Sequence, residues 1–195
     1  MIKLDSDVIL SKKVLIPTGI IASIIIIAMI FASIFGSQKE PMEYLFQLNT
    51  RATNLSATMQ TYNRYISSTS LASSAAALSS NLTAIASSLT ETTQSDEYKN
   101  LSKSATEGIT TSETELITNL NNTLESARLN NNLDKVYAQQ MAAQITDLIY
   151  IETSARNALS DDSYTALKSS LDRSISNLNA LYPNFSNFWY NIRYE

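Results

Sequence analysis

Few residue types in this sequence are suited to chemistry. The 195 residues include no histidine and no cysteine, which removes the commonest general base, the usual transition-metal ligands, thiolate nucleophiles and iron–sulfur clusters. Serine–lysine catalysis and carboxylate pairs are the remaining routes. No Ser-x-x-Lys motif occurs, and between residues 42 and 182 no two carboxylates are three or four positions apart, the spacing that shares a helix face. Carboxylate pairs assembled across helices stay open. We predict that the protein is not an enzyme and has no catalytic residue, cofactor or metal site.

The charged residues favour a solvated surface over a nucleic-acid site. The net charge is −4 at pH 7, and a negative surface repels phosphate backbones. Acidic residues concentrate between Glu91 and Glu125, where they form either one solvated helical face or a surface for a basic partner or cations. Two oppositely charged pairs have the four-residue spacing of solvated ion pairs on one helix: Glu152–Arg156 and Lys168–Asp172.

Apolar residues repeat with helical spacing through most of the chain. Only three glycines occur, well below the usual share of about 7%, which argues against hairpin-dense β folds. Apolar side chains recur at steps of three and four from Leu45 to Ile66, and the pattern resumes from Leu71 to Leu89. Residues 67–70 are a Ser/Thr cluster that interrupts it. We place a kink or tight turn there, with one continuous helix as the alternative.

Capping residues and helix breakers divide this region into four to six helical segments. Starts are predicted where Ser37 and Glu40 precede Pro41, at Ser95 and at Ser112. Ends are predicted at Gly108, at the asparagine run 130–132 and at Pro183. About 140 residues of such segments can bury a core as a bundle with short connections. The sequence therefore predicts an all-α fold with an up-and-down helical bundle over residues 42–182.

A long apolar segment near the start of the chain predicts a membrane anchor. Residues 14–36 carry no charge, and about 20 apolar residues of helix cross a bilayer. Lys3, Lys12 and Lys13 precede the segment, which places residues 1–13 in the cytoplasm, residues 37–41 as a hinge at the membrane and the bundle outside the cell. The apolar run is too long for a cleaved signal peptide, so we predict an uncleaved, single-pass anchor in the cell membrane.

Small residues within this segment have the spacing of a helix-packing face. Ala28, Ala32 and Gly36 are four positions apart, which lets two membrane helices approach closely. The alternative is that alanine is simply frequent there.

Aromatic residues gather near the end of the chain, in and just before residues 183–195. They are candidates for an interaction tail that lies on the outer leaflet or binds a partner. The alternative is that the tail folds back and closes the end of the bundle. An even number of helical segments returns it to the bilayer, and an odd number leaves it at the far end. The candidate residues are Tyr182, Phe185, Phe188, Trp189, Tyr190 and Tyr194.

One short pattern resembles a known family. Leu133, Asp134, Tyr137 and Met141 resemble the segment Phe-Asp-x-x-Tyr-x-x-x-Met of exported ferritin-like helical bundles of unknown function. The resemblance implies a helical bundle and supplies no activity. This chain has Leu133 in place of the phenylalanine and Ile145 where that family has a histidine. A metal or proton role tied to that histidine therefore does not transfer.

These features predict a membrane-anchored protein that works by contact. The first hypothesis is a structural or protein-interaction element of the cell envelope, whose partners are the lipid bilayer and another protein or a second copy. The second hypothesis is a ligand-sensing bundle. The thirteen residues before the predicted anchor are few for a cytoplasmic signalling segment, which counts against it. A ferritin-like redox or metal bundle is the third, and the missing histidines count against it.

Overall fold

The structure is all-helical, as predicted. The computed structural model describes residues 39–160 and 162–188, which form α-helices and short 3₁₀ turns and contain no strand. The 3₁₀ turns are η1 (Asn63–Tyr65), η2 (Thr92–Gln94) and η3 (Asp162–Tyr164). The α-helices are α2 (Pro41–Tyr62), α3 (Thr69–Ser88), α4 (Asp96–Lys99), α5 (Lys103–Leu129), α6 (Leu133–Ala158) and α7 (Thr165–Ser186).

The predicted membrane anchor falls outside the described residues. This applies to residues 14–36 and to the small residues Ala28, Ala32 and Gly36 within them. Within the described ranges, none of the helices combines the length and apolar character that a bilayer crossing requires.

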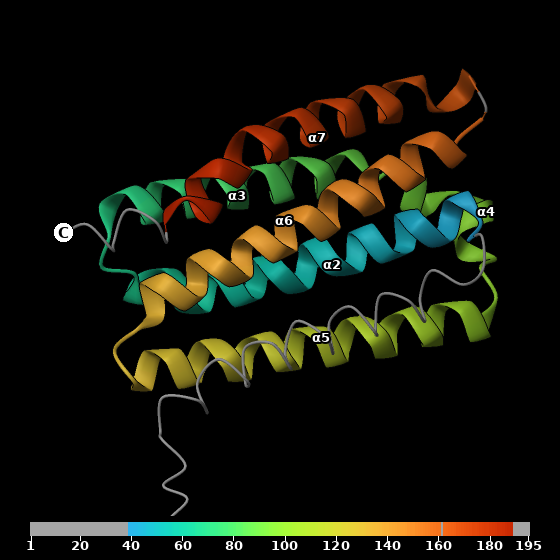
Figure 1. Ribbon diagram of the computed structural model, residues 1–195. Helices are drawn as coiled ribbons and strands as arrows, with labels where there is room; N and C mark the ends of the chain where they lie inside the picture. The colour runs from blue at the N-terminus through green and yellow to red at the C-terminus, as the bar shows by residue number, and fades with distance from the viewer. Residues whose placement is uncertain (1–38, 161, 189–195) are drawn as a thin grey trace, which may run out of the picture. The chain divides into compact units, whose positions relative to one another are not determined.

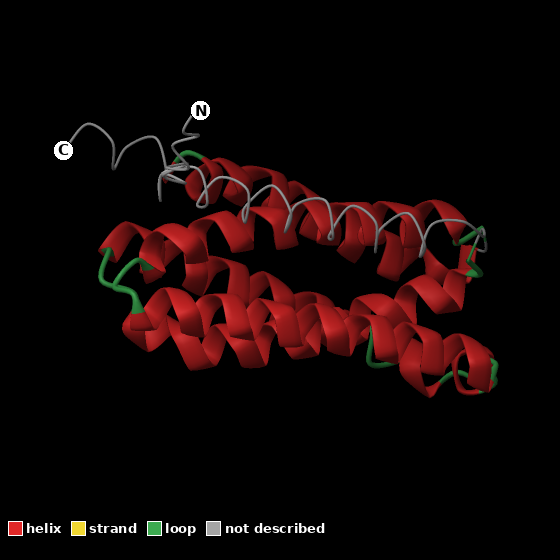
Figure 2. Cartoon of the chain, turned by 60° about the horizontal axis from the view of Figure 1, so that its bottom comes forward, coloured by secondary structure: helices red, strands yellow, loops and turns green. Residues whose placement is uncertain are grey.

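Four of the long helices form a closed ring, and the fifth lies outside it. Helix α2 packs against α3 and α6, and α7 packs against the other sides of α3 and α6. Helix α5 packs on the outer side of the ring against α2 and α6 (Figure 1). Figure 2 shows that the described residues form helices and the loops that join them. The ring alone therefore encloses a core, and α5 covers one of its faces.

Consecutive long helices run in opposite directions (Figure 1). As a result α2 begins at one end of the bundle, and α7 ends at the other (Figure 1). We call these the Pro41 end and the Ser186 end. The turns between α2 and α3 and between α5 and α6 also lie at the Ser186 end.

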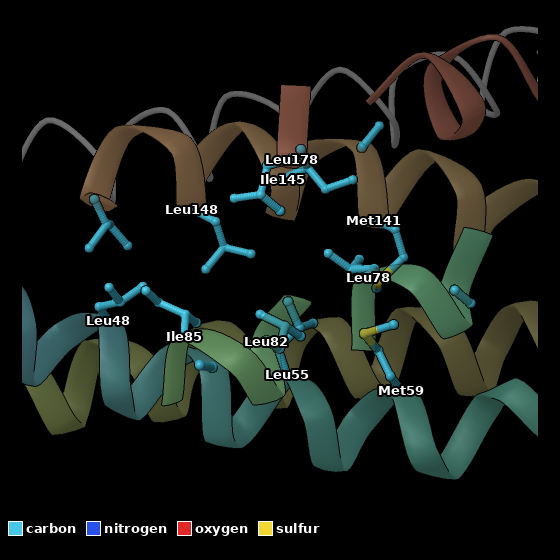
Figure 3. Close-up of a cluster of buried hydrophobic side chains, with 14 of the residues drawn as sticks. Leu48, Leu55, Met59, Leu78, Leu82, Ile85, Met141, Ile145, Leu148 and Leu178 are labelled. Atoms are coloured by element: carbon cyan, nitrogen blue, oxygen red, sulfur yellow. The ribbon is translucent and has the colours of Figure 1, made fainter. Parts of the chain in front are cut away.

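Leucine, isoleucine and methionine side chains fill the ring. Residues from α2, α3, α6 and α7 meet in its centre (Figure 3). Burying each such side chain stabilises the fold by about 1.5–3 kcal/mol before conformational entropy is counted. The apolar stripes of the sequence supply this core, which includes Leu48, Leu55, Met59, Leu78, Leu82, Ile85, Met141, Ile145, Leu148 and Leu178.

Serine caps begin several of the helices. The Ser68 hydroxyl accepts a hydrogen bond from the backbone N–H of Leu71 and begins α3, so the predicted break at residues 67–70 is a true turn between antiparallel helices. Ser95 caps α4 as predicted. Ser102 caps α5 in the same way, with its hydroxyl 3.2 Å from the backbone nitrogen of Ala105.

Three predicted helix boundaries are wrong. Helix α5 continues without a break through Gly108 and Ser112, because Ile109, next to Gly108, and Glu113, next to Ser112, are both buried against the bundle. Helix α7 continues past Pro183 to Ser186, where burial of Phe185 holds the last turn in place. In both helices tertiary packing outweighs the local preference against helix.

Candidate functional site

A cluster of buried polar side chains lies where α2, α5 and α6 meet. Arg51 of α2 is at its centre with only 2% of its surface exposed, and Glu113 of α5 is 1% exposed. Gln47 of α2 and both Gln144 and Asp147 of α6 complete the cluster. It contains one cation and two carboxylates from helices far apart in the sequence, so it is the closest approach to a chemical site in the described part of the chain.

Arg51 uses every nitrogen of its guanidinium in this cluster. Nε and Nη2 both donate to the carboxylate of Glu113, Nη2 at 3.0 Å from Oε1. Nη1 donates to Oε1 of Gln144 at 3.2 Å and to Oδ2 of Asp147 at 3.3 Å. The two-pronged contact with Glu113 is the stronger one, because an arginine fork matches the two oxygens of a carboxylate.

A second layer of hydrogen bonds extends the cluster toward the Pro41 end. Nε2 of Gln47 donates to Oε1 of Glu113 at 2.9 Å. Nζ of Lys39 donates to Oε1 of Gln47 at 2.7 Å. Burial lowers the pKa of Lys39, against the attraction of Glu113 and Glu43. The amide of Gln47 therefore links a half-buried lysine to the buried ion pair.

Helical spacing explains how these side chains reach one place. Gln47 and Arg51 are one turn apart on α2, beside the core residues Leu48 and Ala52. Gln144 and Asp147 are three positions apart on α6, beside Ile145 and Leu148. Glu113 is the only residue that α5 contributes to the cluster.

The protonation of the cluster follows from its charge balance. Burial lowers the pKa of Arg51, but the charges and hydrogen bonds of Glu113 and Asp147 outweigh it, so the pKa is raised and the guanidinium stays charged. Burial raises the pKa of Asp147 to about 7, opposed by Arg51 and reinforced by the negative charge of Glu113. One arginine neutralises one carboxylate, and Asp147 is the carboxylate in excess.

A separate chain of polar side chains lies on the side of α6 that faces α7 and α3. Oε1 of Glu152 accepts a hydrogen bond from the hydroxyl of Ser174 at 2.9 Å, and that hydroxyl accepts one from the amide of Asn81 at 2.8 Å. The amide of Asn177 donates to Oδ1 of Asn81 at 3.2 Å. The other carboxylate oxygen of Glu152, Oε2, is buried without a protein partner. Burial raises the pKa of Glu152 to about 8, only partly offset by Ser174.

The expected ion pair between Glu152 and Arg156 is wrong. Glu152 is fully buried, whereas Arg156 donates from Nε to Oδ1 of Asp172 on α7 at 3.0 Å. The expected pairing of Lys168 with Asp172 is replaced by this contact between α6 and α7. A spacing of four residues places two side chains on one helix side, but the neighbouring helix decides whether that side meets water.

The residues of the short family-like pattern hold a turn together. The Asp134 carboxylate accepts hydrogen bonds from the backbone N–H groups of Ser67 and Ser68, at 3.0 and 2.8 Å. The Tyr137 hydroxyl donates to Oδ1 of Asn63 at 2.6 Å. Both contacts run from the first turns of α6 to the connection between α2 and α3. These two residues, together with the buried Leu133 and Met141, therefore have a structural task here.

The aromatic residues near the C-terminus do not share one environment. Phe185 is buried in the core, Phe188 packs partly against it, and Tyr182 is exposed. The remaining candidates, Trp189, Tyr190 and Tyr194, lie outside the described residues.

Two depressions on the surface are open to solvent. One of about 630 Å³ lies at the Pro41 end and is lined by residues such as Glu43, Glu97 and Tyr164. A wider one of about 1070 Å³ runs along α5 beside Phe46 and Tyr98, whose ring centroids are 5.9 Å apart. Neither reaches the Arg51 cluster, since none of the cluster residues lines them.

The chemistry available to the cluster is limited by its burial. Arg51 and Glu113 are sealed between three helices, so a substrate has no route to them in this conformation. Among residues 39–160 and 162–188, no three acidic side chains gather to hold a metal ion.

The sequence pattern did not predict this cluster, although Arg51 and Asp147 each lie directly beside an apolar stripe. Comparisons of the chain with protein-family models, curated proteins and solved structures give no match.

Proposed function

We propose that this protein is a membrane-anchored, extracytoplasmic helical bundle that binds another protein through its Ser186 end, as a structural or interaction element of the cell envelope. In this proposal the uncharged segment 14–36 is a single-pass anchor with its N-terminus in the cytoplasm. The lysines before the segment and its length support that orientation.

The direction of the helices is the observation that carries the proposal. The five long helices of residues 41–186 alternate in direction, so α7 ends at the end of the bundle opposite the start of α2 (Figure 1). Only four residues separate position 36 from Pro41 in the sequence, so we infer from this short connection that the Pro41 end is the membrane-facing one. Helix α2 has 22 residues, which span roughly 33 Å at 1.5 Å per residue. The Ser186 end then stands away from the lipid and is the end available to a partner.

Exposed apolar side chains support contact at that end. Leu129, the last residue of α5, is 67% exposed, and Tyr65 follows the end of α2 with 41% exposed. Tyr182, near the end of α7, is 40% exposed. Exposed tyrosines are typical anchors of protein interfaces, because they add large contact area and a hydroxyl at low entropic cost.

The sealed Arg51 cluster supports a contact function over catalysis. Its guanidinium donates to Glu113, Asp147 and Gln144, and these groups stabilise the packing of three helices. A catalytic group must reach its substrate, and these side chains are used within the fold.

A pull-down from detergent-solubilised membranes tests the proposal. The tagged full chain is compared with a Tyr65→Ser, Leu129→Ser and Tyr182→Ser triple variant. The matched control is Tyr150→Ser, which changes a tyrosine of similar exposure in the middle of α6. We expect a co-purifying protein that the triple variant loses and the control retains. Equal recovery by both variants, or a wild-type chain with no partner, contradicts the proposal.

The orientation is tested separately with a tag at residue 195. We expect protease added to intact cells to remove this tag without lysis. A tag that is protected until the cells are opened shows that the bundle is cytoplasmic and that the membrane orientation is wrong.

A further inference from the structure

The amino-terminal half of α5 is held to the bundle differently from its other half. Leu120, Leu124 and Ala127 belong to the continuous hydrophobic core, whereas Ile109 is buried but stands apart from it. Between Ile109 and Leu120, Glu113 is the only buried side chain of α5. Residues 103–117, which we call the α5 arm, therefore depend mainly on the buried Ile109, the partly buried Ile117 at the end of the arm and one buried ion pair.

The α5 arm is also a weak helix in itself. Gly108 lies in its middle, exposed, and a Cβ added there would meet nothing within 4 Å. No packing contact thus requires glycine, which costs a helix about 1 kcal/mol relative to alanine. Four threonines in the arm add β-branched side chains of low helix propensity. Residues 100–102, just before the arm, are outside any helix and offer a hinge.

The surface of α2 and α6 beneath the arm contains polar side chains that water can solvate. Arg51, Gln47, Gln144 and Asp147 come from α2 and α6, which belong to the closed ring and pack without the arm. If the arm leaves, these side chains become solvated, and the ring keeps its own core. A buried polar layer costs less to open than a hydrophobic one, because water replaces the hydrogen bonds.

We propose that the α5 arm is a releasable cover, and that the Arg51 surface it uncovers binds an amphipathic helix of another protein with a carboxylate between apolar residues. The charge of Arg51 determines the kind of partner. While the arm is in place, the Glu113 carboxylate accepts two hydrogen bonds from Arg51, and a carboxylate of the partner would restore that contact once the arm has left. An apolar residue one turn from that carboxylate would take the place of Ile109. This surface is distinct from the Ser186 end, so the inference stands apart from the proposed function.

Hydrogen–deuterium exchange on the full chain in detergent tests the release. Glu113→Gln removes the carboxylate, and we expect amides of residues 103–117 to exchange at least about tenfold faster while α3 and α7 are unchanged. Gly108→Ala stabilises the arm, and we expect slower exchange there. The matched control is Glu115→Gln, an exposed glutamate two residues away. Exchange of the arm in step with α3 and α7 in all variants overturns the proposal.

A peptide of residues 103–129 tests the docking and is the probe for a carboxylate-bearing helix. Labelled peptide is titrated into the Glu113→Gln chain, whose own arm no longer offers a carboxylate, and fluorescence anisotropy is recorded. We expect the natural peptide to bind at least about tenfold more tightly than its Glu113→Gln version. Equal binding, no binding to a chain whose arm opens, or dimerisation of the chain through this surface overturns the proposed partner. The pull-down at the Ser186 end is unaffected by any of these results.

Discussion

The guanidinium of Arg51 takes part in two buried ion pairs, one with Glu113 and one with Asp147. Its charge is buried and depends on partners from two other helices. Removing one member of such a buried network leaves opposite charges without compensation, whereas replacing the whole network with apolar groups is often neutral.

Arg51→Met is expected to lower the free energy of unfolding by about 3–5 kcal/mol, because Glu113 stays buried without its cation. Chemical denaturation of the full chain in detergent measures the loss. The control is Arg156→Met, which breaks an exposed pair with Asp172 and is expected to cost about 0–1 kcal/mol. Adding Glu113→Leu and Asp147→Leu to Arg51→Met should recover most of the lost stability, and a further loss would contradict this account.

Glu152 gives the fold an unusual pH dependence. Burial raises its pKa from 4.5 to about 8, so the folded state holds this proton more tightly than the unfolded chain does. The stabilisation is complete below the unfolded pKa and is lost as pH rises through the folded one. Asp147, with a pKa raised to about 7, acts in the same direction. We therefore expect the free energy of unfolding to fall by a few kcal/mol between about pH 5 and about pH 9.

The variant Glu152→Gln isolates this contribution. Its amide keeps an acceptor for Ser174 and has no proton to lose, so we expect the decline between about pH 7 and about pH 9 to disappear. Denaturation midpoints across this range measure it. Glu115→Gln, at an exposed position, should keep the full decline. A natural chain whose stability rises with pH would show that Glu152 is charged in the folded state.

At the scale of helices, sequence periodicity predicts the segments well and their boundaries less well. The stripes that start at Leu45 and Leu71 become α2 and α3, because a run of apolar residues on one face needs other helices to cover it. The break at residues 67–70 is also correct. Gly108 and Pro183 do not end their helices as predicted. Each destabilises a helix by about 1–3 kcal/mol, and the burial of neighbouring side chains outweighs this loss.

The candidate site is much harder to predict than the segments. Arg51, Glu113 and Asp147 come from three helices, with Glu113 and Asp147 lying 62 and 96 residues beyond Arg51 along the chain. A stripe tells which face of a helix is buried, but it does not tell which helix covers that face. The only signal in the sequence is polar residues at the edge of a stripe, such as Arg51 beside Ala52 and Asp147 beside Leu148.

The connection between α2 and α3 depends on a residue of another helix. Asp134→Ala removes the acceptor for the backbone N–H groups of Ser67 and Ser68. We expect a loss of about 1–2 kcal/mol, similar to the loss of a helix cap. Thermal unfolding of the full chain measures it, with the exposed Glu115→Ala as control. If both variants have the same midpoint, the contact does not stabilise the turn.

For the whole molecule, α7 is the helix that closes the ring between α3 and α6. Its last turns combine a buried side chain with an exposed one, Phe185 and Tyr182. Phe185→Ala is expected to destabilise the entire bundle by about 3–5 kcal/mol through the cavity it leaves. Tyr182→Ala should change stability by less than about 0.5 kcal/mol, as at other exposed positions. Calorimetry distinguishes the two, and equal losses would contradict the assignment of Tyr182 to contact rather than packing.

The hydrogen bonds between Asp134 and the connection from α2 to α3 also have a consequence for biogenesis. The amides of Ser67 and Ser68 find their acceptor only 67 and 66 residues further along. Ribosomes add about 5–20 residues per second, so the first hairpin waits several seconds with these groups hydrated. Its two helices can associate early, but the hairpin reaches its final form only after α6 has emerged. Nascent chains that stop before Asp134 should therefore be targets for chaperones and proteases.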